Sequence, residues 1–466
     1  MGGPERRGRR SSPVAGAHPV SGGEDYERLV VGGCLINPDA FHSAAAEVDA
    51  TDFGDSRCRD AWEAMAAILG DGGSVDSVTV LRRMKAPDPK WFAGVTDGMP
   101  RVVSLEAWSR AVAAQATLRR LVAMASKIGE AAKRARPDEV DETVERALAG
   151  VVRVVERASD RTPVAQASAV TNRALAYADQ IVQSAEGMLG LPTGLQDLDA
   201  ALHGLRPGRL YIVGARTGMG KSILLMQMAR ENARAGRVVA LFSAEMTADE
   251  VGFRLLCSGA EVAEDDLRAK SGQHEAWERF MREAALVAQD RLSVDESEVL
   301  TPAGIRARSY QIKAANSGQL DLVLVDYVQL VHPEKRSESR EREVAEVSRA
   351  LKRLAKSLNV PVVVAAQLNR GAEERRGRRP ALWDLRESGA LEQDADTVIL
   401  LHRPKPRGKV RHGVERAEAI VAKNRGGSAC VVPLDFRGAW YRFDDVGTGP
   451  LTGKMAEEPD DEQPEP

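Results

Sequence analysis

The stretch LYIVGARTGMGKS, residues 210–222, decides the fold class of this chain. The apolar run Leu210–Val213 predicts a strand, the glycine-rich turn after it predicts a loop, and the residues from Lys221 onward predict a helix. This order is typical of a phosphate-binding loop, in which glycines let backbone N–H groups curl around phosphates. Lys221 would reach the β- and γ-phosphate oxygens, and the Ser222 hydroxyl could bind Mg²⁺. The predicted nucleotide-binding residues are Ala215, Arg216, Thr217, Gly218, Met219, Gly220, Lys221 and Ser222.

Further apolar runs surround this motif and alternate with helical stretches from residue 193 onward. Runs this apolar indicate strands buried on both faces, so we expect an α/β fold with a mainly parallel sheet covered by helices. The predicted strands are Leu210–Val213, Val238–Ser243, Leu322–Val325, Pro361–Ala366, Thr397–Leu401 and Ala419–Ala422. Two later runs, Val431–Phe436 and Trp440–Phe443, predict a terminal hairpin.

Two carboxylates follow predicted strands and are candidates for nucleotide chemistry. Asp326 ends the run LVLVD, where an NTPase needs a second group on the metal. A strand-terminal Asp alone is more often an ordinary loop cap, but the phosphate-binding loop makes the metal role the better interpretation. Glu245, in FSAEM, is a candidate to polarise the attacking water. From composition alone, a solvent-facing acid at a strand edge is an equally good interpretation of Glu245.

The N-terminal half has a helical pattern, and residues 118–128 and 140–155 both show apolar side chains at i, i+3, i+4 spacing. No strand alternation appears there, so we expect a small all-α domain. A moderately amphipathic helix from about Ala165 to Ala185 would need to dock on something, because an isolated helix of this length is marginal in water. The predicted parts are a disordered basic tail (1–22), a helical domain (23–157), a linker with a docking helix (158–191), an α/β domain (192–446) and a disordered acidic tail (447–466).

Composition excludes several classes of protein. The 466 residues carry a net charge of −3, so an anionic partner must be met by a local patch rather than a global basic field. Aromatic residues make up only 4%, which disfavours a protein that reads bases mainly by stacking. The four cysteines include no CxxC pair, which argues against a zinc ribbon or disulfide scaffold. No export signal or membrane-spanning run is evident, and we expect a cytoplasmic protein.

Taken together, the motifs of the C-terminal half resemble replicative DNA helicases of the DnaB family. They occur in the family's order with few gaps, and residues 384–396 are the most specific part. The matching stretches are the phosphate-binding loop with Ala in first place, FSAEM (242–246), LVLVDYVQL (322–330), AQLNR (366–370), DLRESGALEQDAD (384–396) and KNRGG (423–427). The N-terminal half is similar more loosely, and its middle, 87–100, is shorter than usual for the family.

The resemblance implies a RecA-like P-loop core, assembled as a homohexameric ring around single-stranded DNA and driven by ATP and Mg²⁺. Lys221 and Ser222 would hold phosphate and Mg²⁺, and Asp326 would complete the metal shell. Further roles carried over by the resemblance are Glu245 as general base, Gln367 as γ-phosphate sensor, Arg386, Glu387 and Gly389 as the loop that grips the DNA backbone, and Lys423 and Arg425 as the pair that reaches the neighbouring subunit's nucleotide. The helical domain would form a collar that helps build the ring and receives a primase, and a helicase loader is a further expected partner.

We therefore expect an ATP-hydrolysing 5′–3′ replicative DNA helicase that unwinds the duplex at the fork. The alternatives are a RecA-type ring ATPase that binds DNA or protein without unwinding, and a non-hydrolysing adaptor descended from a helicase. The intact set of candidate site residues argues against the adaptor. Basic residues before the DNA loop, among them Arg370 and Arg379, suit either a solvated loop or a DNA channel. Trp383 could stack on a base, but we expect a partly buried core residue.

Overall fold

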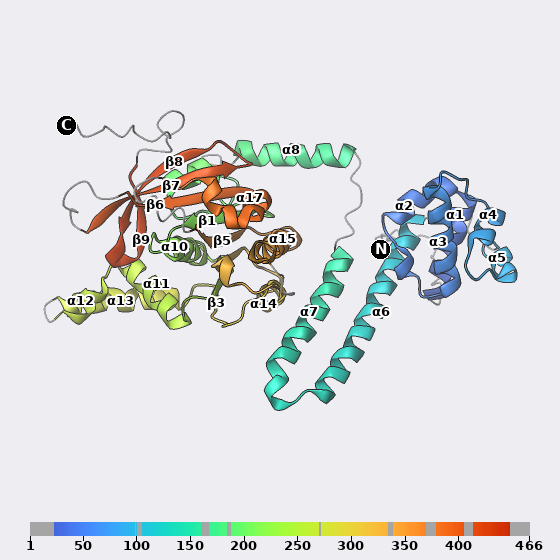
Figure 1. The fold of residues 1–466 in the computed structure, drawn as a ribbon, viewed down its shortest axis with the longest axis horizontal. Helices are drawn as coiled ribbons and strands as arrows, with labels where there is room; N and C mark the ends of the chain where they lie inside the picture. The colour runs from blue at the N-terminus through green and yellow to red at the C-terminus, as the bar shows by residue number, and fades with distance from the viewer. Residues whose placement is uncertain are drawn as a thin grey trace, which may run out of the picture. The chain divides into compact units, whose positions relative to one another are not determined.

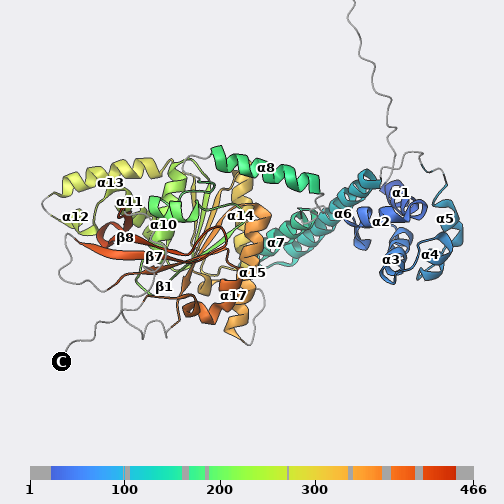
Figure 2. The same cartoon turned by 90° about the horizontal axis from the view of Figure 1, so that it is seen from above.

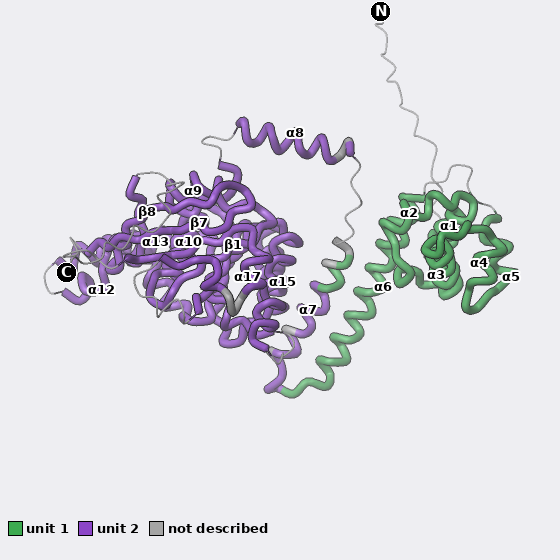
Figure 3. Tube along the Cα trace, turned by 45° about the horizontal axis from the view of Figure 1, so that its top comes forward, with its two compact units in different colours: residues 1–136, 153–165 green, residues 137–152, 166–466 purple. Residues whose placement is uncertain are grey.

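The computed structural model describes most of the chain, in two compact units. The described residues are 23–97, 99, 105–159, 167–183, 188–269, 272–333, 339–369, 379–404 and 413–447. The two predicted tails, 1–22 and 447–466, therefore lie outside the described residues except for Gly447. One unit comprises residues 1–136 and 153–165, and the other comprises residues 137–152 and 166–466 (Figure 3).

The first unit is helical, and no strand occurs among the described residues of 23–159, as predicted. Its core gathers around Trp62, whose ring lies 4.4 Å from that of Phe41 and 5.2 Å from that of Phe53. Asp55, the N-cap of α3, accepts a hydrogen bond from a backbone N–H in the first turn of that helix. The main helices are α1 (Gly23–Ile36), α2 (Phe41–Ala45), α3 (Ser56–Gly70), α4 (Ser77–Arg83), α5 (Pro89–Gly94) and α6 (Leu105–Arg134), and α7 (Val140–Ser159) contributes its residues 153–159 to this unit.

The second unit is built on a nine-stranded sheet of order β3-β2-β4-β5-β1-β6-β7-β8-β9 (Figures 1 and 2). The first six strands in this order are parallel to one another, and β7, β8 and β9 continue the sheet in antiparallel fashion. The strands are β1 (Leu210–Ala215), β2 (Val239–Ser243), β3 (Leu292–Asp295), β4 (Leu322–Asp326), β5 (Val362–Gln367), β6 (Thr397–His402), β7 (Val414–Asn424), β8 (Cys430–Arg437) and β9 (Arg442–Asp445).

Both faces of the sheet are buried, which explains the continuous apolar runs. Along β1, Tyr211 and Val213 join one core, whereas Leu210 and Ile212 join the other. The first core is shared with α9 (Gln196–Leu202), α10 (Lys221–Arg234) and α11 (Ala248–Ala260), and the second with α14 (Pro302–Ala315), α15 (Arg340–Leu358) and α17 (Gly389–Asp394). Helices α12 (Glu264–Arg268) and α13 (Gln273–Val287) follow α11. The predicted α/β class is confirmed.

Two parts of the sheet differ from the prediction. The sequence does not predict β3, an edge strand whose four residues are all half-buried and therefore do not form an apolar run. The predicted strand Ala419–Ala422 is the end of the much longer β7, in which buried and half-buried residues alternate. That alternation arises because β7 is antiparallel to both of its neighbours and lies toward the edge of the sheet.

The expected linker helix is present as α8 (Ala167–Gln183). Within the second unit, Arg206 Nη1 donates a hydrogen bond of 2.7 Å to the Tyr177 hydroxyl of α8. Large apolar side chains of α8 are exposed: Val170, Leu175, Tyr177, Ile181 and Val182. Among the helices that the structure describes, none combines the length and the apolar composition that a membrane span requires.

Candidate active site

The phosphate-binding loop leaves the carboxyl end of β1 and turns directly into α10. Gly218 and Gly220 have φ angles of +76° and +104°, which favour glycine. Gly220 also has no room for a side chain, because an added Cβ would lie 2.7 Å from Cζ of Phe443 in β9. The loop therefore presents bare backbone at the N-terminus of α10, the arrangement that binds phosphate.

Lys221, Ser222 and Asp326 meet at the carboxyl ends of the central strands β1 and β4. Burial lowers the pKa of Lys221 below its usual value, and the nearby negative charges of Asp326 and Glu245 act against this shift. Burial raises the pKa of Asp326, against a hydrogen bond from Ser222 and the charge of Lys221. Asp326 ends β4, whose register with β2 pairs it with Ser243, the last residue of that strand.

One oxygen of Asp326 fits the metal role that the sequence assigns to it. Oδ1 is buried and has no hydrogen-bond partner among the described residues, while the carboxyl group accepts a hydrogen bond from Ser222. A buried carboxylate oxygen is costly to leave unmatched, and a divalent cation would satisfy it. Ser222 and Asp326 thus form a donor set suited to Mg²⁺ coordinated by hydroxyl and carboxylate oxygens.

Glu245 lies in the turn after β2, and its side chain is exposed. Ser243 holds this turn, since its hydroxyl donates to the Met246 carbonyl (2.8 Å) and accepts from the Met246 N–H (3.1 Å). The Ala244 N–H donates to the Asp326 carbonyl at 2.8 Å, which ties the turn to β4. The charge of Glu245 acts to raise the pKa of both Lys221 and Asp326, which places its carboxylate within electrostatic range of both groups.

Gln367 reaches the phosphate-binding loop directly. It is the last residue of β5 and pairs in register with Ala215, where the loop begins. Its Nε2 donates to the Thr217 hydroxyl at 3.0 Å. Sequence reasoning named both residues but did not predict this contact, which depends on β5 lying beside β1.

Arg403 lies against the phosphate-binding loop, although the sequence did not predict it as a site residue. Its guanidinium lies 4.0 Å from the ring centroid of Phe436 and donates to the Gly218 carbonyl at 2.8 Å. It also pairs with Glu415 of β7. The part of the sheet from β6 to β9 thus stabilises the phosphate-binding loop. No local sequence motif predicts this role.

Lys423 and Arg425 lie far from the carboxyl ends of β1 and β4, where the phosphate-binding loop is. Asn424 pairs with Thr397 at the start of β6, and Thr397 pairs with Tyr211 near the start of β1. Both cations lie against the end of α17: Lys423 Nζ donates to the Glu392 carbonyl at 2.5 Å, and Arg425 Nη2 donates to the Gln393 carbonyl at 3.0 Å. The pair thus lies at the amino ends of the parallel strands, whereas the phosphate-binding loop of the same chain lies at their carboxyl ends.

The predicted DNA loop lies in η6 (Leu382–Ser388) and at the start of α17. The side chains of Arg386 and Glu387 lie outside the described part of the chain, and Gly389 is exposed. Trp383 is 62% exposed, so the expectation of a core residue was wrong. Of the basic run, residues 370–378 are also undescribed, while Arg379 forms a two-pronged ion pair with Glu418, with distances of 2.7 and 2.8 Å.

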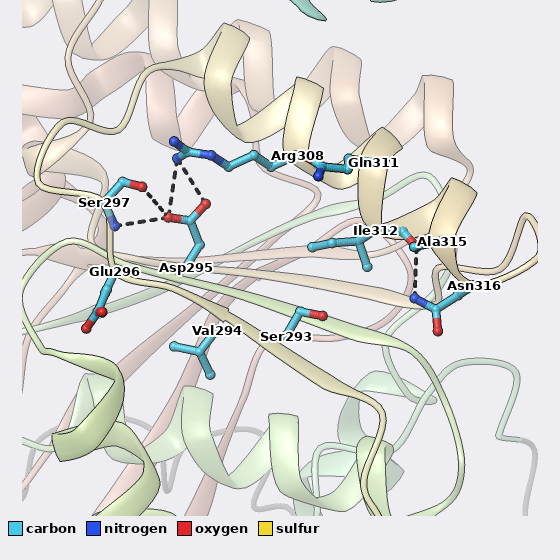
Figure 4. Close-up of a pocket in the computed structure, with 10 residues that line it drawn as sticks. All are labelled: Ser293, Val294, Asp295, Glu296, Ser297, Arg308, Gln311, Ile312, Ala315 and Asn316. Carbon is cyan, nitrogen blue, oxygen red and sulfur yellow. Dashed lines mark hydrogen bonds and ion pairs between the residues drawn. The ribbon is translucent and has the colours of Figure 1, made fainter. Parts of the chain in front are cut away.

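A separate groove of about 490 Å³ lies between β3 and α14 (Figure 4). Asp295 and Arg308 form an ion pair of 2.9 Å along it, and Ser297 donates to Asp295. Its lining includes none of the predicted site residues, and β2, β4 and β5 lie between β3 and β1. The groove is therefore distinct from the nucleotide site.

Comparison with known proteins gives one consistent result. The family model for the DnaB-like helicase C-terminal domain matches residues 190–445, and the model for the DnaB-like helicase N-terminal domain matches residues 23–113. The replicative DNA helicase DnaB of Leifsonia xyli subsp. xyli is 34% identical over 433 residues, covering 90% of this chain and 93% of the relative. The replicative DNA helicase DnaC of Bacillus subtilis is 30% identical over 443 residues, covering 91% and 96%.

Solved structures agree on the fold. A DnaB-like replicative helicase, solved in a study of its interactions with primase, aligns with a TM-score of 0.67 at 23% identity over 91% of this chain and all of that one (100%). A second solved structure, the ATPase domain of another protein, aligns with a TM-score of 0.56 at 28% identity over 60% of this chain and 100% of that domain. The predicted RecA-like core with a helical N-terminal domain is confirmed. From its two matching domain models and its full-length relatives, the chain belongs to the DnaB family of replicative DNA helicases.

Proposed function

We propose that this chain is an ATP-dependent DNA helicase that forms a homohexameric ring, moves 5′ to 3′ on single-stranded DNA and unwinds the duplex at the replication fork. One observation supports the ring. The phosphate-binding loop lies at the carboxyl ends of the parallel strands, and the pair Lys423 and Arg425 lies at their amino ends. A nucleotide site that needs both is complete only where two copies meet. The test is ATP-driven unwinding of a forked duplex that carries a 5′ single-stranded arm.

ATP and Mg²⁺ are the proposed cofactors. Bound Mg²⁺ would neutralise charge on the β- and γ-phosphates. Ser222 and Asp326 are the proposed ligands from the protein, and Lys221 holds the phosphate oxygens. Glu245 polarises the attacking water, and Gln367 senses the γ-phosphate. The direct contact between Gln367 and Thr217 supports the last assignment, because it links the sensor to the loop that cradles the phosphates.

The proposed domains are the helical collar (23–157), the linker (158–191) and the motor (192–446). The exposed apolar side chains of α8 support docking of this helix on an adjacent subunit, where they would be buried. A primase that binds the collar and a helicase loader are the proposed protein partners. The proposed location is the cytoplasm.

The rival function is a RecA-type ring ATPase that binds DNA without separating strands. The same fork distinguishes the two, because the rival would hydrolyse ATP on single-stranded DNA and leave the duplex intact. The helical N-terminal domain, matched by its own family model, favours the helicase.

Glu245→Gln is expected to leave nucleotide binding intact and to lower hydrolysis by roughly 10²–10⁴-fold, because only the group that polarises water is lost. Binding would be followed with a fluorescent ATP analogue, and turnover by phosphate release. Glu250→Gln, in the first turn of α11, is the matched control and should hydrolyse ATP normally. A normal rate for Glu245→Gln would remove Glu245 as the general base.

Arg386→Ala is expected to weaken binding of single-stranded DNA and to uncouple hydrolysis from movement. A lost phosphate contact should lower the log–log dependence of affinity on salt by ~0.7 per contact. The loss should be similar on all sequences, because phosphate carries no base information.

The measurement for Arg386→Ala is the Kd for single-stranded DNA of several sequences as a function of salt concentration. Arg282→Ala is the control, because this arginine is exposed and lies on α13, which packs against α11 and is not part of the predicted DNA loop. A changed base preference with an unaltered salt slope would contradict a backbone contact.

A further inference from the structure

The end of β5 lacks a strand neighbour on one side. The ladder between β4 and β5 ends at the pair Val325–Val364, although β5 continues to Gln367. On its other side, β5 stays paired with β1 as far as Ala215 and Gln367. The chain leaves β4 after Asp326 and turns into η5 (Val328–Leu330).

The side chain of Gln329 fills the missing place. Its Nε2 donates to the Gln367 carbonyl at 2.9 Å, and its Oε1 accepts from the Gln367 N–H at 3.1 Å. A carboxamide carries the same donor and acceptor as a peptide group, so one side chain reproduces the two bonds that a neighbouring strand would make. Gln329 is itself held in place, because Arg340 donates to its carbonyl and the adjacent Val328 is buried.

We infer that Gln329 is the positioning residue of the γ-phosphate sensor: its carboxamide clamps the backbone of Gln367 so that the Gln367 side chain is aimed at the phosphate-binding loop. The side-chain bond from Gln367 to Thr217 depends on that aim. Gln329 also follows Asp326 by only three residues. A movement at the metal carboxylate therefore reaches the sensor through one short turn. The inference rests on the proposed role of Gln367.

Gln329→Ala tests the clamp in the full-length protein. Without nucleotide, hydrogen exchange at the Gln367 N–H should become roughly 5- to 100-fold faster, because its acceptor is gone. Affinity for a non-hydrolysable ATP analogue should fall roughly 3- to 10-fold while ADP affinity stays at the wild-type value, because only the γ-phosphate contact depends on the sensor. Gln319→Ala, which removes an exposed carboxamide bonded to Asp321, should change neither quantity.

Gln329→Glu is the second variant and separates the two bonds. Its carboxylate can still accept from the Gln367 N–H but cannot donate to the carbonyl, so exchange should stay near the wild-type rate while affinity for the ATP analogue falls. Wild-type exchange and wild-type affinities in Gln329→Ala would overturn the inference. Equal losses of ADP and analogue affinity would overturn it too, because they would indicate a generally loosened site. A wild-type protein that binds the analogue no better than ADP would instead refute the sensor role of Gln367, which is a failure of the proposed function itself.

Discussion

Lys221→Ala is expected to abolish ATP hydrolysis, with a loss of at least roughly 10²–10³-fold. Lys221 is the only lysine in the loop 215–222 and stands at the first position of α10, next to the backbone that would hold the phosphates. The charges of Asp326 and Glu245 oppose the effect of burial on its pKa and so favour the ammonium form. With alanine at this position, two acidic groups would face the phosphates without the cation that offsets them.

Single-stranded-DNA-stimulated phosphate release measures the effect of Lys221→Ala, and thermal unfolding checks that the protein is folded. Lys356→Ala is the matched control, because this exposed lysine lies in the last turn of α15, away from the loop. Wild-type hydrolysis by folded Lys221→Ala protein would show that the phosphates are held elsewhere, and the whole site would have to be reassigned.

The sequence was sufficient for the centre of the sheet and for the terminal hairpin of β8 and β9, but not for the edge strand β3. A central parallel strand such as β4 is buried on both faces, so it appears as an unbroken apolar run that ends at Asp326. The edge strand β3 has no such run, because its residues are only half-buried. The failed expectation for Trp383 has a related cause: a large apolar residue predicts burial on average, yet η6 presents this one to solvent.

For the candidate site, the sequence likewise identifies individual residues but does not predict the contacts between them. Phosphate-loop glycines, Lys221 and Asp326 are recognisable because each belongs to a short local pattern. The clamp of Gln329 on Gln367 joins residues 38 apart, and the support of Gly218 by Arg403 joins residues 185 apart. Such contacts follow from strand order and register, which no short pattern encodes. The location of Arg425 likewise follows only from the antiparallel return of β7.

That location has a direct consequence for Arg425. From Tyr211 to Ala215, β1 runs roughly 13 Å at about 3.3 Å per residue. The phosphate-binding loop begins at Ala215, whereas Arg425 lies near the level of Tyr211, on the far side of β6. The Arg425 side chain is 54% exposed, and its guanidinium contacts Gln393 and Asp396 of its own subunit. An arginine side chain cannot span the distance to its own phosphate-binding loop, so a role in hydrolysis requires the nucleotide of another copy. An arginine that neutralises charge on the γ-phosphate contributes roughly 10³–10⁵ in rate.

Arg425→Ala and Lys221→Ala proteins are therefore expected to be nearly inactive alone and to regain ATPase activity when mixed and allowed to exchange subunits. In a random equal mixture, about a quarter of the interfaces would join an intact Lys221 to an intact Arg425, which limits the recovery to about a quarter of the wild-type rate. Copurification of differently tagged subunits establishes that mixed rings form. Either variant mixed with the double variant, Lys221→Ala with Arg425→Ala, should stay at the floor, because no interface can then be complete. If the two single variants form mixed rings and remain inactive, Arg425 does not serve the neighbouring site, because every complete interface that the assignment requires would be present without effect.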